Sequence, residues 1–142
     1  MVFLGEFHHS LDEKGRVILP SKFREPLSRG AIISKGDGCL FIYTLEEFEQ
    51  VANEIREKAK SSSQAREAAR SFFAGASDAT PDKQGRLTLP NQLRTYAKLK
   101  KEVTVLGVYS RIEIWDDASW NSRSAEGDAS LNDTGSLPDL GI

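Results

Sequence analysis

The sequence is poor in cysteine and in long apolar runs. Its single cysteine, Cys39, excludes a framework of disulfides within the chain and a cysteine-rich metal site, so we expect a buried structural thiol. No stretch approaches the roughly 18 apolar residues that a membrane helix needs. The first residues lack the basic and apolar regions of a signal peptide. These absences predict a soluble, cytoplasmic protein.

A large excess of either charge is also missing. The formal net charge is −2 and the isoelectric point is about 5.7, which argues against a protein that coats nucleic acid by bulk charge. The charge is uneven: residues 121–142 hold one arginine against four acidic residues, a net −3, which leaves about +1 for the rest of the chain. A nucleic-acid site would therefore be a local basic patch, with avidity supplied by several copies of the chain.

An internal repeat is present. Residues 12–20 (DEKGRVILP) return as residues 82–90 (DKQGRLTLP), at an offset of 70. Further on, residues 40–43 (LFIY) resemble residues 112–115 (IEIW) at an offset of 72. The match covers a whole structural unit in each half, so we interpret the chain as two small modules. Modules of this size bury little apolar area alone and should need each other or other subunits.

Both units predict the same β-rich order of elements. Asp and Gly at fixed places predict a turn, because Asp caps its own backbone and Gly accepts a positive φ. A proline at the start of a short helix costs no hydrogen bond, and Pro26 should end the first such helix early. The expected strands are residues 6–11, 16–19, 31–34 and 40–43, then 76–80, 86–89, 103–106 and 112–115; the expected short helices are residues 20–26 and 90–98.

A helical insert separates the two units. Thr44 and Glu47 have the spacing of a capping box, and apolar residues then recur at helical spacing up to the serines at 61–63 and again over about 64–74. We expect an antiparallel hairpin that packs on the first unit, with the apolar stripe as core. From residue 121 the apolar pattern stops, which predicts a disordered tail. The expected division is 1–43 first module, 44–75 insert, 76–120 second module and 121–142 acidic tail.

The repeated segments resemble a known family. Residues 1–5 (MVFLG) and 11–24 (LDEKGRVILPSKFR) are closely similar to the amino-terminal signature of MraZ proteins, and residues 82–90 and 112–116 are similar to the second half of that family. The resemblance extends over about residues 1–120. One D-x-x-x-R motif would be a weak signal, but two at this separation, both running into Leu-Pro, are specific.

The resemblance implies a fold and a function. The fold is α+β, mainly β, with two tandem AbrB-like swapped-hairpin modules that form one pseudo-two-fold barrel. Such barrels assemble into homo-oligomeric rings of about eight or more subunits. The implied function is that of a nucleoid-associated transcription regulator, usually a repressor, that binds promoter direct repeats upstream of the division and cell-wall gene cluster. No cofactor, small-molecule substrate or membrane partner is implied.

The resemblance also names the candidate DNA-binding residues. An arginine presents a planar fork of donors that matches guanine or a phosphate, and an aspartate four residues earlier can hold it. Gln84 replaces the lysine of the first motif, and Lys83 lies one place earlier, so we expect unequal contributions with the first motif the stronger. Phosphate contacts are expected from the other basic groups near the turns. The full set is Asp12, Lys14, Arg16, Lys22, Arg24, Asp82, Lys83, Arg86 and Arg94.

Other interpretations stay open at this point. Each Asp–Arg pair could simply close its turn, and Arg24 and Arg94 could form structural ion pairs. A ring-forming scaffold that binds proteins is the alternative function, since the low isoelectric point permits it. No catalytic motif is recognisable, so we expect no enzyme and no catalytic residue. His8 and His9 have no third histidine or cysteine partner, so a metal site is not expected; a strand with one exposed face explains them.

Overall fold

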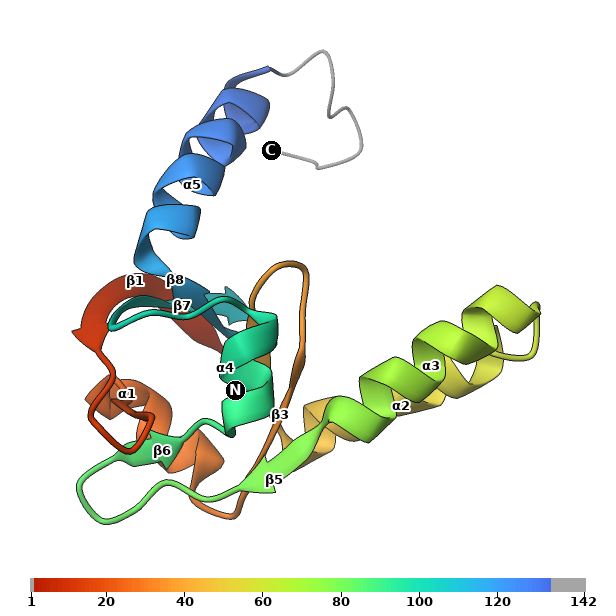
Figure 1. The fold of residues 1–142 in the computed structure, drawn as a ribbon, viewed down its shortest axis with the longest axis horizontal. Coiled ribbons are helices and arrows are strands. Elements are labelled where there is room, and N and C mark those ends of the chain that lie inside the picture. The colour runs from red at the N-terminus through yellow and green to blue at the C-terminus, as the bar shows by residue number, and fades with distance from the viewer. Residues whose placement is uncertain (1, 134–142) are drawn as a thin grey trace.

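The structure is a computed structural model that describes residues 2–133 (Figure 1). It is an α+β fold dominated by antiparallel sheet, in agreement with the class expected from the sequence. The elements are β1 (Phe3–Ser10), β2 (Arg16–Ile18), α1 (Ser21–Arg24), the 3-10 helix η1 (Glu25–Leu27), β3 (Ala31–Lys35), β4 (Leu40–Thr44), α2 (Leu45–Lys58), α3 (Ser63–Gly75), β5 (Ser77–Ala79), β6 (Arg86–Thr88), α4 (Asn91–Tyr96), β7 (Glu102–Tyr109), β8 (Ile112–Asp116) and α5 (Asp117–Asn132).

The two halves of the chain exchange strands. A six-stranded sheet has the order β1-β7-β8-β4-β3-β5, so β1 of the first half pairs with β7 of the second. In return β5, from the second repeat, pairs with β3 of the first. A separate two-stranded ribbon consists of β2 and β6, one from each repeat. Because each half supplies strands to the other, neither repeat can complete its pairing alone. A closed barrel and a two-fold axis stay predictions.

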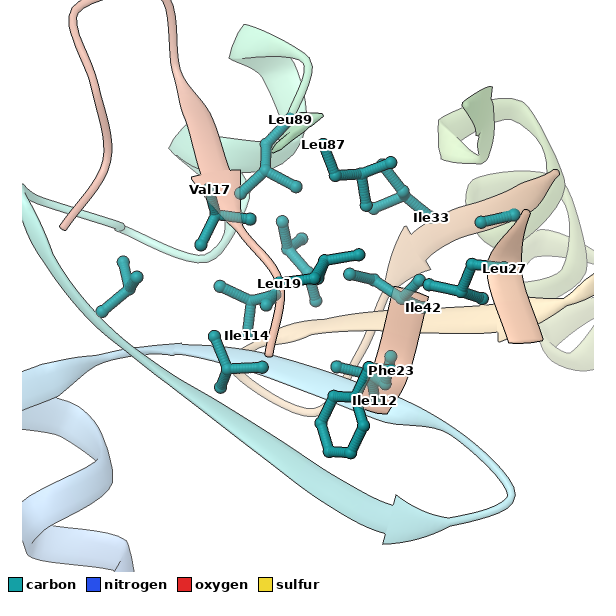
Figure 2. Packing of buried hydrophobic residues seen from close by; sticks show 14 of the residues in the cluster. Val17, Leu19, Phe23, Leu27, Ile33, Ile42, Leu87, Leu89, Ile112 and Ile114 are labelled. Atoms are coloured by element: carbon teal, nitrogen blue, oxygen red, sulfur yellow. The ribbon is translucent and has the colours of Figure 1, made fainter. Parts of the chain in front are cut away.

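The ribbon contributes to the core with one of its faces. Val17, Leu19, Leu87 and Leu89 are fully buried and point toward apolar side chains of the large sheet (Figure 2). The sheet residues in the same cluster include Ile33, Ile42, Ile112 and Ile114. This packing fixes the orientation of the ribbon, and its other face is left for solvent.

The short helices close the ends of the core. Pro20 and Pro90 precede α1 and α4 as N-cap residues. Phe23 of α1 meets Phe3 and Phe7 of β1 edge-on, at centroid distances of 5.2 and 5.4 Å. Pro26 ends α1 early, as expected, and the chain continues as η1.

The helices α2 and α3 form the expected hairpin, which extends away from the sheet (Figure 1). Thr44 and Ser62 cap the two helices by accepting the backbone N–H of Glu47 and Ala65. The expectation that their apolar stripe is core is wrong, because no residue of either helix is fully buried. Two helices that project from a domain can cover each other on one side only, so the stripe is half-buried.

The expected disordered tail is wrong over residues 121–132, which belong to α5. The helix is anchored at its start: Trp120 packs on Trp115 at 5.6 Å between centroids, and the Arg123 guanidinium lies 5.0 Å above Trp115 and reaches Asp37. Sequence patterning missed α5 because its later turns carry no apolar stripe. Residues 134–142 of the expected tail lie outside the described residues.

The scarcity of cysteine and of long apolar runs in the sequence can be compared with the structure. Cys39 is a free, fully buried cysteine, as expected. Burial, the largest cause, and the nearby Glu113 carboxylate raise the pKa of its thiol to about 12. Within residues 2–133, no helix is long and apolar enough to cross a membrane.

Candidate nucleic-acid interface

The turn before β2 is organised by Asp12. Its Oδ1 accepts the backbone N–H groups of Lys14 and Arg16, both at 2.9 Å. Its Oδ2 accepts the side-chain Nε–H of Arg16 at 2.6 Å. Gly15 supplies the positive φ of +74° that the turn requires. The sequence DEKGR therefore folds into a rigid loop that holds the Arg16 guanidinium by one edge.

The turn before β6 repeats this geometry. Asp82 Oδ1 accepts the backbone N–H groups of Gln84 and Arg86 at 2.9 Å, and Oδ2 accepts Nε–H of Arg86 at 2.7 Å. Gly85 has a φ of +78°. The pairing of each aspartate with its arginine is thus confirmed in both repeats, and the replacement of lysine by Gln84 leaves it unchanged because only the backbone of that position takes part.

Both aspartates are held in their charged form. The backbone N–H of the paired arginine lowers the pKa of each carboxyl most strongly, and the guanidinium of the same arginine and a second backbone N–H add to the effect. Burial acts in the opposite direction but does not reverse the shift. The carboxylates are therefore ionised at neutral pH and keep each arginine oriented.

Arg24 and Arg94 cross from one repeat to the turn of the other. Arg24 Nε donates to the Leu19 carbonyl at 2.9 Å, and its guanidinium covers Gly85 of the opposite turn. Arg94 does the same with the Leu89 carbonyl and Gly15. These half-buried arginines support the two turns from behind. The sequence left two roles open for them, phosphate contacts and structural ion pairs. The structure shows a structural contact of another kind, with a backbone carbonyl and with the glycine of the opposite turn.

The outward face of the ribbon presents Arg16 and Arg86 together. In the antiparallel register Arg16 lies opposite Thr88, and Ile18 lies opposite Arg86. Residues 17 and 87 point inward and are fully buried, so these four side chains share the outer face. In the part of the chain that the structure describes, neither arginine makes a hydrogen bond through its Nη atoms, and each is paired with its aspartate through Nε. Both guanidinium groups thus keep the N–H donors of their two Nη atoms available on a rigid support.

The three lysines among the candidates differ in position. Lys14 and Lys83 are exposed at the two turns. Lys22 lies over the rings of Phe7 and Phe23, with Nζ 5.1 Å and 5.9 Å from the centroids. The structure therefore brings six of the expected residues together on the two turns and places Lys22 on the β1 side of α1.

The two histidines differ in their surroundings. His8 Nδ1 lies 3.0 Å from Asp117 of α5, and Nε2 lies 3.0 Å from Glu6. The hydrogen bond with Asp117 is the main cause that raises the pKa of His8. His9 is more buried, and burial lowers its pKa. His8 therefore joins β1 to the start of α5.

Comparison with known proteins divides the chain into the same two halves as the internal repeat. The family model described as MraZ protein matches the chain twice, over residues 2–71 and 72–135. Three similar curated proteins are each named "Transcriptional regulator MraZ". The one from Micrococcus luteus is 48% identical, and those from Paenarthrobacter aurescens and Kocuria rhizophila are 46% identical, each over 134 residues that cover 94% of this chain and 94% of the relative.

Proposed function

The chain belongs to the MraZ family, and on that premise we propose that it is a transcription regulator that binds specific DNA sequences through the β2–β6 ribbon. It is not an enzyme, and the relatives are named as regulators.

The observation that carries the proposal is the pair of aspartate-held arginines on one exposed ribbon face. A two-stranded β-ribbon is narrow enough to enter the major groove of B-DNA. Each guanidinium is held by Nε, and the edge formed by its two Nη groups makes no hydrogen bond within the described residues 2–133. That arrangement suits bidentate donation to O6 and N7 of guanine or to a phosphate. Since the turns are rigid, little side-chain entropy is lost on binding.

Lys14 and Lys83 supply contacts of another kind. Both are exposed at the turns that flank the ribbon. Lysines in such places neutralise phosphates and position the duplex, but they do not read its sequence. Arg24 and Arg94 act indirectly, because they hold the turns in which Arg16 and Arg86 lie.

One subunit makes few basic contacts, so binding has to be multivalent. Each neutralised phosphate adds roughly 0.9 to the slope of log affinity against log salt, and a site with only a few phosphate contacts is weak at cellular salt. We propose a ring of about eight or more subunits in which consecutive barrels engage direct repeats upstream of the division and cell-wall gene cluster. Bound protein would then exclude polymerase and act as a repressor on the nucleoid. Avidity supplies the affinity without new contacts.

The test compares DNA duplexes from upstream of the protein's own gene. Affinity is measured by gel shift on the intact duplex and on duplexes in which all repeats but one are scrambled. Scrambling is expected to abolish tight binding nearly completely. Unchanged affinity on the single-repeat duplex would contradict the multivalent mechanism, and absence of specific binding by the folded, assembled protein would favour the protein scaffold instead.

A further inference from the structure

An apolar side chain lies between the two arginines on the outer face of the ribbon. Ile18 of β2 is 46% exposed, although its neighbours Val17 and Leu19 are fully buried. The corresponding residue of β6 is Thr88, which is also exposed. The repeat therefore keeps the arginine and changes the side chain two residues later.

The strand register fixes what surrounds Ile18. It lies directly opposite Arg86, and Arg16 is two residues earlier on the same face of the same strand. Side chains opposite each other on an antiparallel pair have β-carbons about 4.5–5.5 Å apart. Ile18 therefore neighbours both arginines on the face that a bound surface would cover.

Single exposed aliphatic residues are common on proteins, so exposure alone decides nothing. The position of Ile18 between two arginines is what indicates a role, because the base edges of the major groove carry one apolar group, the 5-methyl of thymine. The guanine atoms that accept hydrogen bonds from arginine lie in the same groove. Ile18, which lies opposite Arg86, can therefore make an apolar contact with the methyl group of a thymine next to the guanine or phosphate that Arg86 contacts.

We propose that Ile18 is a specificity-determining residue that reads a thymine methyl beside the Arg86 contact. This inference rests on the proposed function and adds a base preference to it. Arg16 has Thr88 opposite it, in place of isoleucine, so the two ends of the ribbon present different chemistry. A ribbon with unlike ends reads a site without two-fold symmetry, since palindromic sites mirror symmetric readers.

The experiment replaces thymine by uracil, which removes only the 5-methyl group. Gel shifts compare the duplex from upstream of the protein's own gene with duplexes carrying uracil at one thymine of the repeat at a time. The wild-type protein should lose about fourfold in affinity per contacted methyl at a particular position, as expected for burial of one methyl group. The variant Ile18→Ser should bind the thymine and uracil versions of that position equally.

Two further variants keep the result interpretable. Ile18→Thr retains a β-branched residue and therefore preserves the strand even where serine would weaken the ribbon. It should also show a smaller uracil effect than the wild-type protein. Leu4→Ser removes an exposed aliphatic residue of β1, which at 56% is somewhat more exposed than Ile18, and should behave as wild type at every position. A uracil effect that is the same in wild type and in both Ile18 variants, or no uracil effect in wild type, would overturn the inference while leaving the regulator intact. Absence of any specific binding by the wild-type protein would overturn both this inference and the proposed function.

Discussion

Replacing Gly85 with alanine should destabilise the chain through Arg24, a residue of the other repeat. Gly85 has φ +78°, and a residue with a β-carbon in the left-handed region costs about 1–2 kcal/mol. A β-carbon there would also lie 2.5 Å from Arg24 Cζ, so the guanidinium must move and lose its hydrogen bond to the Leu19 carbonyl. A hydrogen bond from a charged group contributes about 1.5–3 kcal/mol. The free energy of unfolding should therefore fall by about 2.5–5 kcal/mol in total.

Gly38 provides the matched control. It has φ +74°, but the atoms nearest to an added β-carbon would be Arg123 Nη1 at 3.9 Å and Trp115 Cζ3 at 4.0 Å. Gly38→Ala should therefore cost only the backbone strain, about 1–2 kcal/mol. The difference between the two alanine variants measures the displacement of Arg24.

A double-mutant cycle tests the reasoning directly. In an Arg24→Ala background, Gly85→Ala no longer displaces a guanidinium and should cost about as much as Gly38→Ala. Urea denaturation followed by tryptophan fluorescence gives the four free energies, at one protein concentration because self-association shifts apparent stability. If Gly85→Ala costs the same in both backgrounds to within about 0.5 kcal/mol, the two residues are uncoupled, which would refute the support of the Gly85 turn by Arg24.

Two other predictions use single groups. Cys39 is fully buried with a thiol pKa of about 12, so at pH 8 it should react with a thiol reagent only when urea unfolds the chain; rapid reaction of the native protein would contradict this. His8 should titrate above pH 6.5 and His9 below it in an NMR titration, and the reverse order would contradict the contacts. Because the folded-state pKa of His8 is raised, its contact with Asp117 stabilises the folded chain below pH 6.5. This contribution to stability is lost as the pH rises through the folded-state pKa. The melting temperature of wild type should therefore exceed that of His8→Asn more at pH 5.5 than at pH 8.

The turns could be predicted because their causes are local. Asp, Gly and Arg at fixed spacing define which backbone groups the aspartate can accept and where the chain needs a positive φ. Both turns have the same geometry although Gln84 replaces the lysine of the first repeat. The short helices and strands beside the turns could be predicted for the same reason, because proline and alternating apolar residues influence only the backbone within a few residues of them.

The partners across the fold could not be predicted from the residues alone. The pairing of β1 with β7 depends on contacts about a hundred residues apart, and only the family resemblance indicated an exchange of strands. Arg24 illustrates the same limit: its charge left a phosphate contact and an ion pair open, whereas its half-buried guanidinium contacts the Leu19 carbonyl and Gly85 of the other repeat. The helix α5 was missed because its stability begins with Trp120 and Arg123 on Trp115, a contact with another element.

The affinity of Arg16→Ala for DNA from upstream of the protein's own gene decides whether the ribbon arginines read the sequence. A bidentate arginine–base contact contributes about 1–3 kcal/mol, and its loss in every subunit of a ring is multiplied, so specific binding should disappear in a gel shift. The variant should keep the wild-type size on a sizing column and its cooperative melting. Arg29→Ala, an exposed arginine beside Glu46 of α2, should bind as wild type does. Undiminished, sequence-specific binding by assembled Arg16→Ala would contradict the central claim that the ribbon arginines read the DNA.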